Sequence, residues 1–408
     1  MPEEQGLEAE SPSLPATGVR GQWRMAWVGM LVTLVGVGCA RLAFGIVLPE
    51  MKRDLGLSYT QAGSLGMLTA LGYLLMLLPA GQLARRWSNR GSVLLGLSVI
   101  TAGFVGLWLV QGFLPLQALM VLLGTGTAFV FTPLVSLLTG WFPQRRGMVI
   151  GMATSGVGLG VLLSGVLVPQ LSLAYGPGSW RVVWAIFAGL AALSVLLSVL
   201  VLRDPPARPG TSADKPSRSL SVYRNPGVLL VGAAYGLGGF AFSMQTLFML
   251  SYTLSAGVSP TTAGTLVAVN GLLSVVSGVG WGWISDHLGR GPAMVLAAGL
   301  SFLAMLAPVL WPSLLSFGLH YVVVGLTISG LFTLFQASST EQVRAPDAPL
   351  ALSAITVFFA LGQLLGPAVA GTVIDASGGF RQAFLLASLA TLLALVLTLR
   401  IHHSARRQ

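Results

Sequence analysis

The sequence predicts an all-α membrane protein in which twelve transmembrane helices form two pseudo-symmetric halves of six. Three observations lead to this fold class: an apolar composition, twelve long apolar segments, and a polar stretch at the midpoint of the chain. Hydrophobic residues make up 54% of the 408 residues and charged residues only 8%, whereas a soluble domain carries about 25% charge. Water could not solvate this chain once folded, so we expect an integral membrane protein.

Crossing a bilayer takes roughly 20 apolar residues, and each half of the chain contains six segments of that kind. The first six lie at about 25–48, 60–82, 92–111, 116–140, 147–169 and 180–202. The second six lie at about 227–252, 261–283, 292–311, 314–337, 350–374 and 380–400. Residues 203–225 between them are rich in proline, glycine, serine and charge, which predicts a solvated linker without a core.

This pattern divides the chain into five regions. They are a tail at 1–22, a six-helix half at 23–202, the linker at 203–225, a second half at 226–401 and a short tail at 402–408. The first tail is acidic and contains proline, and it lacks the basic start of a secretory signal peptide. We expect it to be disordered.

The basic residues predict the orientation in the membrane. Seventeen of the 22 lysines and arginines fall in the tails, the linker and the loops of one side, and four fall on the other. Short loops rich in Lys and Arg stay in the cytoplasm, so we expect both termini and the linker there, in a multi-pass protein of the cell's inner (plasma) membrane. These basic loops explain the net charge of +10 without a nucleic-acid partner. We also expect the protein to be a monomer in the lipid bilayer.

Two glycine-containing loops show that the halves repeat each other. Residues 81–91 follow the second span and residues 282–291 follow the eighth, at an offset of 201 residues, close to half the chain. Glycine rows also recur in the fifth and eleventh spans, where small residues allow close helix packing. Two six-helix halves in parallel repeat are typical of transporters that work by alternating access.

These loops resemble the signature loop of the major facilitator superfamily, G-x-L-A-D-R-x-G-R-R. In the second copy Gly282, Asp286, Gly289 and Arg290 match this pattern. In the first copy Arg85 stands at the position of the family's Asp, and Ser88 stands at the position of a Gly. The resemblance covers about residues 23–401 and implies the major facilitator fold. In that fold spans 1, 4, 7 and 10 line a central cavity, and spans 2, 5, 8 and 11 form the interface between the halves.

A weaker resemblance concerns the subfamily. Residues 141–156 are similar to the 4–5 loop and fifth helix of the monocarboxylate and oxalate/formate porters, and residues 41–49 to the first helix of some bacterial porters. The span-4 motif R-x-x-Q-G-x-G of proton-driven drug antiporters is degraded, because Met120 occupies the position of its Arg. This departure disfavours drug/proton exchange.

Ionisable side chains within spans are candidates for function because lipid makes a charge costly. The clear cases are Arg41 in the first span and His320 in the tenth, which we expect at similar depth on opposite sides of the central cavity. The planar donors of Arg suit a carboxylate or similar oxyanion, and a protonated His320 would add a second donor. The alternatives are an Arg41 that satisfies backbone carbonyls and a neutral His320 bonded to a neighbouring helix.

Further polar side chains are predicted to contact the substrate from the same cavity. They are Gln245, Tyr235, Tyr321 and Thr127. Their alternative role is hydrogen bonding between helices, which is also the role we expect of Asn270 and Gln363. The single cysteine, Cys39, excludes an internal disulfide, and we expect neither a metal site nor a cofactor.

The signature loops are predicted to form a cytoplasmic gate. By the family pattern, Asp286 lies against the start of the fifth span, where the helix dipole and Arg145 or Arg146 favour an anion. Arg85 cannot make the equivalent contact in the first half, so we predict that it pairs with Glu341. The other residues of the predicted gate are Gly282, Gly289 and Arg290.

The resulting hypothesis is a secondary active transporter that moves a small organic anion, a monocarboxylate, by alternating access. Coupling to protons in symport is expected, and uniport and anion exchange are left open. An ATP-driven pump is excluded because neither Lys52 nor Lys215 follows a Gly as in a phosphate-binding loop, and an enzyme is not expected. The alternative is an exporter of hydrophobic or cationic compounds, although the lack of Asp or Glu near the middle of any span argues against a cationic cargo.

Overall fold

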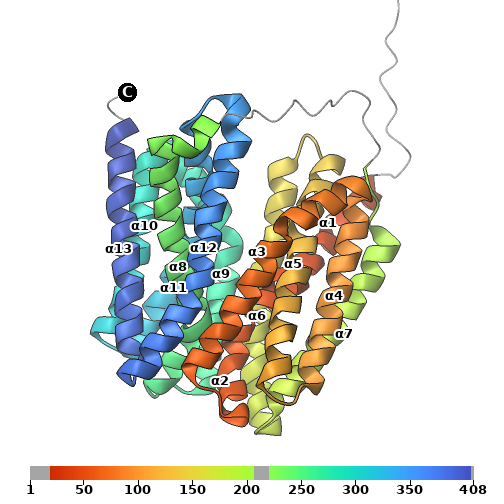
Figure 1. Ribbon diagram of the computed structural model, residues 1–408, viewed down its shortest axis with the longest axis vertical. Coiled ribbons are helices and arrows are strands. Elements are labelled where there is room, and N and C mark those ends of the chain that lie inside the picture. The colour runs from red at the N-terminus through yellow and green to blue at the C-terminus, as the bar shows by residue number, and fades with distance from the viewer. Residues whose placement is uncertain (1–18, 206–219, 406–408) are drawn as a thin grey trace, which may run out of the picture.

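The computed structural model describes residues 19–205 and 220–405, and all the elements in these ranges are helices. Twelve spans in the described chain are long and apolar enough to cross a membrane, which confirms the number predicted. Figure 1 shows two helical halves side by side, one from red to yellow-green and one from green to blue. The protein is therefore a multi-pass membrane protein with two six-span halves.

Three consecutive helices form the first span, and five more complete the first half. They are α1 (Val19–Thr33), η1 (Leu34–Leu42), α2 (Phe44–Leu55), α3 (Tyr59–Arg86), α4 (Asn89–Leu109), α5 (Phe113–Trp141), α6 (Arg146–Tyr175) and α7 (Ser179–Val201). Helix α1 includes the last residues of the predicted N-terminal tail. The rest of that tail, residues 1–18, lies outside the described residues.

The second half has the same six-span plan, with two short 3-10 helices added. Its elements are η2 (Leu220–Arg224), α8 (Pro226–Ser255), α9 (Pro260–Leu288), α10 (Arg290–Leu310), α11 (Leu314–Glu341), η3 (Ala345–Asp347), α12 (Ala348–Ser377) and α13 (Phe380–Ala405). Most of the linker, residues 206–219, and residues 406–408 lie outside the described part of the chain. Helix α13 continues four residues beyond the predicted end of this half, at 401.

Local sequence explains where several helices begin. Ser58 and Gln61 form a reciprocal capping box at the start of α3, which satisfies two backbone N–H groups that the helix leaves free. Asn225 and Ser259 cap α8 and α9 with their side chains, and a proline follows each of them. Proline is favoured there because its fixed φ suits the first helical turn.

The first span is broken in the middle, which the sequence analysis did not predict. Residues Leu34–Leu42 form a π-helix, and π segments are rare and frequent at functional sites. Thr127 of α5 donates a hydrogen bond to the carbonyl of Gly36, at 2.7 Å. The backbone of Gly38 lies against that of Gly160 in α6. Neighbouring helices thus support the irregular backbone, as a membrane interior requires.

The two ends of the bundle differ in how the halves meet. We call the side with the linker and the loops at 87–88 and 289 the linker end, and the opposite side the far end. At the far end glycines bring the halves into backbone contact. A Cβ at Gly63 or Gly371 would overlap the carbonyl of Pro367 or Tyr59, and one at Gly45 would overlap the backbone around Leu247.

At the linker end α6 and α9 separate. A Cβ added at Gly147 or Gly151 of α6 would meet nothing within 4 Å, and the same holds for Gly278, Gly280 and Gly282 of α9. In Figure 1 the halves approach each other at the bottom and diverge toward the top. The structure is therefore closed at the far end and open at the linker end.

Candidate functional site

Arg41 lies at the end of the π segment, in a cavity between the two halves. The cavity measures about 50 Å³ and is partly open. It is lined by Arg41, Leu42, Phe44, Gly45, Gly66, Thr69, Ala70, Phe242, Ser243, Thr246, Leu247, Gln363 and Pro367. Among these residues Arg41 alone carries a charge. The cavity is thus a mostly apolar site with one fixed positive group.

Arg41 joins the two halves through a neutral partner. Its Nη2 donates a hydrogen bond to Oε1 of Gln363 in α12, at 2.5 Å. The guanidinium carbon lies 4.3 Å from the centre of the Tyr73 ring of α3, which is a cation–π contact. An arginine has five N–H donors, and among the described residues one of them is seen to donate. The group is therefore held in place while it keeps donors for an anion.

Sequence reasoning expected Gln363 to hydrogen-bond between helices and did not name Tyr73. Gln363 does form such a bond, and it joins the two halves because α12 packs against α3 and brings the amide within reach of Arg41. For Tyr73, its place in a span of the predicted half-to-half interface was the available signal.

His320 does not face Arg41, contrary to the expectation from its depth. It is fully buried inside the second half, and its Nδ1 lies 2.8 Å from the carbonyl of Ala304 in α10. That carbonyl would normally bond to the N–H four residues on, but Pro308 has none. Because a carbonyl only accepts, Nδ1 carries the proton. His320 thus satisfies a carbonyl that a proline leaves free, which is the alternative role named for it above.

The other predicted contacts lie at three separate places. Tyr235 of α8 accepts a hydrogen bond from Gln336, at 2.9 Å, and stacks on Phe359 at 4.3 Å. The hydroxyl of Tyr321 lies 3.5 Å from that of Thr253, inside the second half. Thr127 supports the π-helix, as described above.

Gln245 lines a second cavity, which lies within the second half rather than between the halves. The structure therefore does not gather the predicted substrate residues around Arg41. Their predicted role in substrate binding stays a prediction.

A carboxylate closes the far end of the interface. The two oxygens of Asp375, in the last turn of α12, accept hydrogen bonds from the backbone N–H groups of Tyr59 and Thr60, at 3.1 and 2.6 Å. These N–H groups begin α3 in the other half and have no partner within the helix. The positive end of the helix dipole adds to the attraction.

The predicted gate at the linker end is not assembled in this structure. Glu341 forms an ion pair with Arg290 of its own half, at 2.5 Å, rather than with Arg85. The side chain of Asp286 is exposed, and the described residues show no ion pair between it and Arg145 or Arg146. The physical reason is the separation of the helices at this end. The predicted cross-half pairs stay predictions for a conformation closed there.

The signature loops themselves differ as their sequences suggest. Gly289 ends α9 with φ +86°, a conformation that side chains other than glycine rarely adopt. Ser88 has extended backbone, and its side chain accepts a hydrogen bond from the N–H of Gly91, at 2.8 Å. The serine that departs from the family pattern therefore caps α4 in place of making a left-handed turn.

Comparison with known proteins identifies the family. A family model described as the uncharacterised MFS-type transporter YbfB matches residues 33–399. Human monocarboxylate transporter 11 is 28% identical over 406 residues, which cover 95% of this chain and 84% of that protein. Rat monocarboxylate transporter 12 is 25% identical over 319 residues, or 69% of this chain and 64% of the rat protein, so that match spans a little under two thirds of its length.

A solved structure shows the same fold. It is a bacterial homologue of the human lysosomal transporter Spinster, in an inward-facing and unoccupied conformation. It superposes with a TM-score of 0.76 at 18% identity and covers 95% of this chain and 98% of its own. The comparison confirms the predicted twelve-span architecture.

Proposed function

Because this chain belongs to the YbfB-type family of major facilitator transporters, we propose that it carries a small organic anion, a monocarboxylate, across the membrane by alternating access. The observation that carries this proposal is the Arg41 guanidinium in the cavity between the halves. A charge within a membrane span is costly to maintain, and the contacts of Arg41 are the neutral Gln363 and Tyr73. A single carboxylate would complement it.

The position of Arg41 supplies a mechanism. Arg41 belongs to the first half and Gln363 to the second, so an anion bound between them contacts both halves. The planar guanidinium can hold a carboxylate with two parallel hydrogen bonds. Enclosing the pair then costs less than enclosing the cation alone, because removing an uncompensated ion from water costs several kcal/mol. Anion binding would therefore favour the closed intermediate through which access changes sides.

The printed names of the relatives support the substrate class. Two proteins similar to this chain over much of its length are monocarboxylate transporters. The basic residues of the linker end support a cytoplasmic orientation for it, so the present conformation would open toward the cytoplasm. His320 lies outside the cavity, and we do not assign it the proton-coupling role that the sequence suggested.

Ligand-dependent stability of the purified protein in detergent tests the proposal. Pyruvate, phenylpyruvate and inorganic oxyanions would be compared on wild type, Arg41→Ala and Arg41→Lys. A ligand at 100 times its Kd stabilises the folded state by about 2.7 kcal/mol, which raises the melting temperature. We expect a carboxylate to do this for wild type, weakly for Arg41→Lys, and not for Arg41→Ala.

A second candidate function rests on the rest of the cavity lining. Phe44, Phe242 and Leu247 make most of this surface apolar, which would also suit an exporter of hydrophobic compounds. In that case apolar cations or neutral compounds would raise the melting temperature, and Arg41→Ala would leave the effect unchanged. That result would replace the anion proposal.

A further inference from the structure

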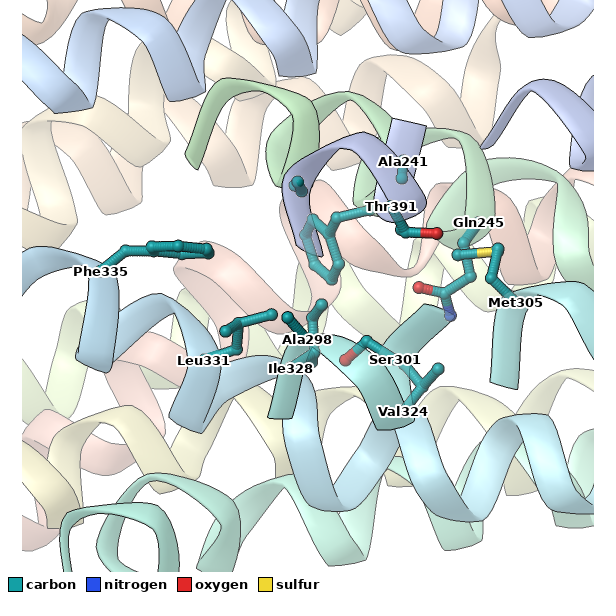
Figure 2. Close-up of a pocket in the computed structure, with 13 residues that line it drawn as sticks. Ala241, Gln245, Ala298, Ser301, Met305, Val324, Ile328, Leu331, Phe335 and Thr391 are labelled. Carbon is teal, nitrogen blue, oxygen red and sulfur yellow. The ribbon is translucent and has the colours of Figure 1, made fainter. Parts of the chain in front are cut away.

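A second cavity lies inside the second half, behind the face of α8 that borders the Arg41 cavity. It measures about 20 Å³, which is room for about one water-sized group. Helices α8, α10, α11 and α13 enclose it, and most of its lining is apolar. Figure 2 shows the Gln245 amide directed into the space between Ser301, Val324 and Met305.

The amide oxygen of Gln245 has no hydrogen-bond partner among the described residues, although the side chain is only 7% exposed. Leaving a buried acceptor unpaired costs about 1–3 kcal/mol. Such a group in a native structure calls for an explanation. The missing partner must be a donor, because a carbonyl oxygen only accepts.

The hydroxyls around this cavity cannot supply that donor. Thr391 donates to the carbonyl of Ser388, at 2.9 Å. Thr327 donates to the carbonyl of Val323, at 2.7 Å, so the Ser301 hydroxyl 3.1 Å away donates to Thr327. These hydroxyls therefore present acceptors to the cavity, and together with the Gln245 oxygen they fit a group that brings its own hydrogen.

Phe242 connects this cavity with the one at Arg41, because it lines both. It lies one helical turn from Gln245 on α8, about 4.5 Å along the axis. Its ring contacts Phe332 of α11 edge-on, with centroids 5.4 Å apart. The Phe242 side chain is half-buried, and its rotation would join the two spaces.

We propose that the cavity beside Gln245 is a subsite for a neutral hydrogen-bond donor at the distal end of the transported anion. The substrate class is then a monocarboxylate with an apolar or aromatic body and a terminal hydroxyl or ring N–H. Its carboxylate binds Arg41, its body passes Phe242, and its donor bonds to Oε1 of Gln245. This inference rests on the proposed anion site. A terminal ammonium is excluded because the cavity lining offers no negative charge.

Such a subsite predicts selectivity by hydrogen bonding. A site built to accept a hydrogen bond from a substrate rejects the analogue that lacks the donor, because its own polar group is left unpaired. One neutral bond of this kind corresponds to roughly tenfold in affinity. Phenylpyruvate and 4-hydroxyphenylpyruvate form a matched pair of probes that differ only in the terminal hydroxyl.

The test measures the affinities of both probes for the full-length protein in detergent. Wild type should bind 4-hydroxyphenylpyruvate about tenfold more tightly, and Gln245→Met should bind the two acids equally. Ser251→Ala is the matched control, since Ser251 is also a buried α8 side chain without a partner in the described chain but lines neither cavity. This control should keep the wild-type preference. The ratio of the two affinities is measured on a single preparation of each variant, so a lower fraction of folded protein does not change it.

Two results would overturn the subsite. One is that wild type binds both acids with equal affinity, a result that does not depend on whether Gln245→Met folds. The other is that Gln245→Met keeps the preference for 4-hydroxyphenylpyruvate. Neither result contradicts the anion site as long as Arg41→Ala loses binding of both acids. If neither acid binds wild type, the anion site fails and the subsite fails with it.

Discussion

The far end and the linker end of the interface between the halves are in opposite states. At the far end, Gly371 of α12 lies against the Tyr59 carbonyl, and Asp375 caps α3 of the other half. At the linker end, Gly147 of α6 and Gly280 of α9 face open space. The far end therefore shows the contacts that hold the halves together. The linker end shows glycines that could allow such contacts but do not make them in this conformation.

This difference explains why glycines recur along much of α6 and α9. Halfway along, Gly158 and Gly271 keep α6 and α9 in backbone contact, as a pivot would require. The glycines beyond the pivot have no packing role in the conformation described. They become useful if the halves rock and the linker end closes, because small residues allow backbones to approach.

The largest expected effect comes from blocking the far-end contact. In Gly371→Leu the new side chain would overlap the backbone of Tyr59, so the far end cannot close. We expect transport to fall more than tenfold and the linker end to close instead. Spin labels on cysteines at the exposed Arg86 and His287, in a Cys39→Ser background, would then report a shorter distance between the halves than in the unsubstituted labelled protein.

The matched variant is Gly280→Leu at the open end. It meets no atom in this structure, so folding and the long label distance should be preserved. Transport should still fall, because closure at the linker end would be blocked. If Gly280→Leu transports normally, the linker end does not close by helix approach at this position, and the rocking model is wrong there.

A smaller effect is expected from Asp375→Asn, which removes the charge that caps α3. Hydrogen bonds to a charged group contribute about 1.5–3 kcal/mol, and solvent exposure of Asp375 reduces this to about 1 kcal/mol. The population closed at the far end should fall about fivefold, as seen by the same label pair. An unchanged distance distribution would show that the cap contributes nothing to closure.

Asp54 provides the control, because it makes similar contacts at the far end within one half. It accepts hydrogen bonds from Trp180 and Arg181, which together hold the pKa of its carboxyl below the ordinary value. Its stabilising contribution is therefore present above about pH 4, the ordinary aspartate pKa, and is lost as the pH falls through the folded value. Asp54→Asn should lower the melting temperature slightly at pH 7, and by less at pH 3, without changing the label distance.

The twelve spans could be predicted because length, apolarity and loop charge are properties of the sequence alone. The break at Leu34–Leu42 could not, because the support from Thr127 and Gly160 comes from helices distant in sequence. The prediction of which way side chains point was wrong for a related reason. Depth in the membrane follows from counting residues, but the rotation of His320 toward α10 depends on a carbonyl freed by Pro308. Likewise, Gln363 becomes a partner of Arg41 only when the halves come together.

The smallest expected effect concerns the ion pairs of the open end. Glu341 pairs with Arg290 here, and we predict that it changes partner to Arg85 when the linker end closes. Exposed ion pairs contribute about 0–1 kcal/mol, so Arg85→Glu or Glu341→Arg alone should reduce transport by no more than about fivefold. The double charge reversal should recover most of the wild-type rate in proteoliposomes. A double mutant no better than the single mutants would mean that Glu341 keeps Arg290 throughout the cycle, and that Arg85 closes the linker end by another contact or not at all.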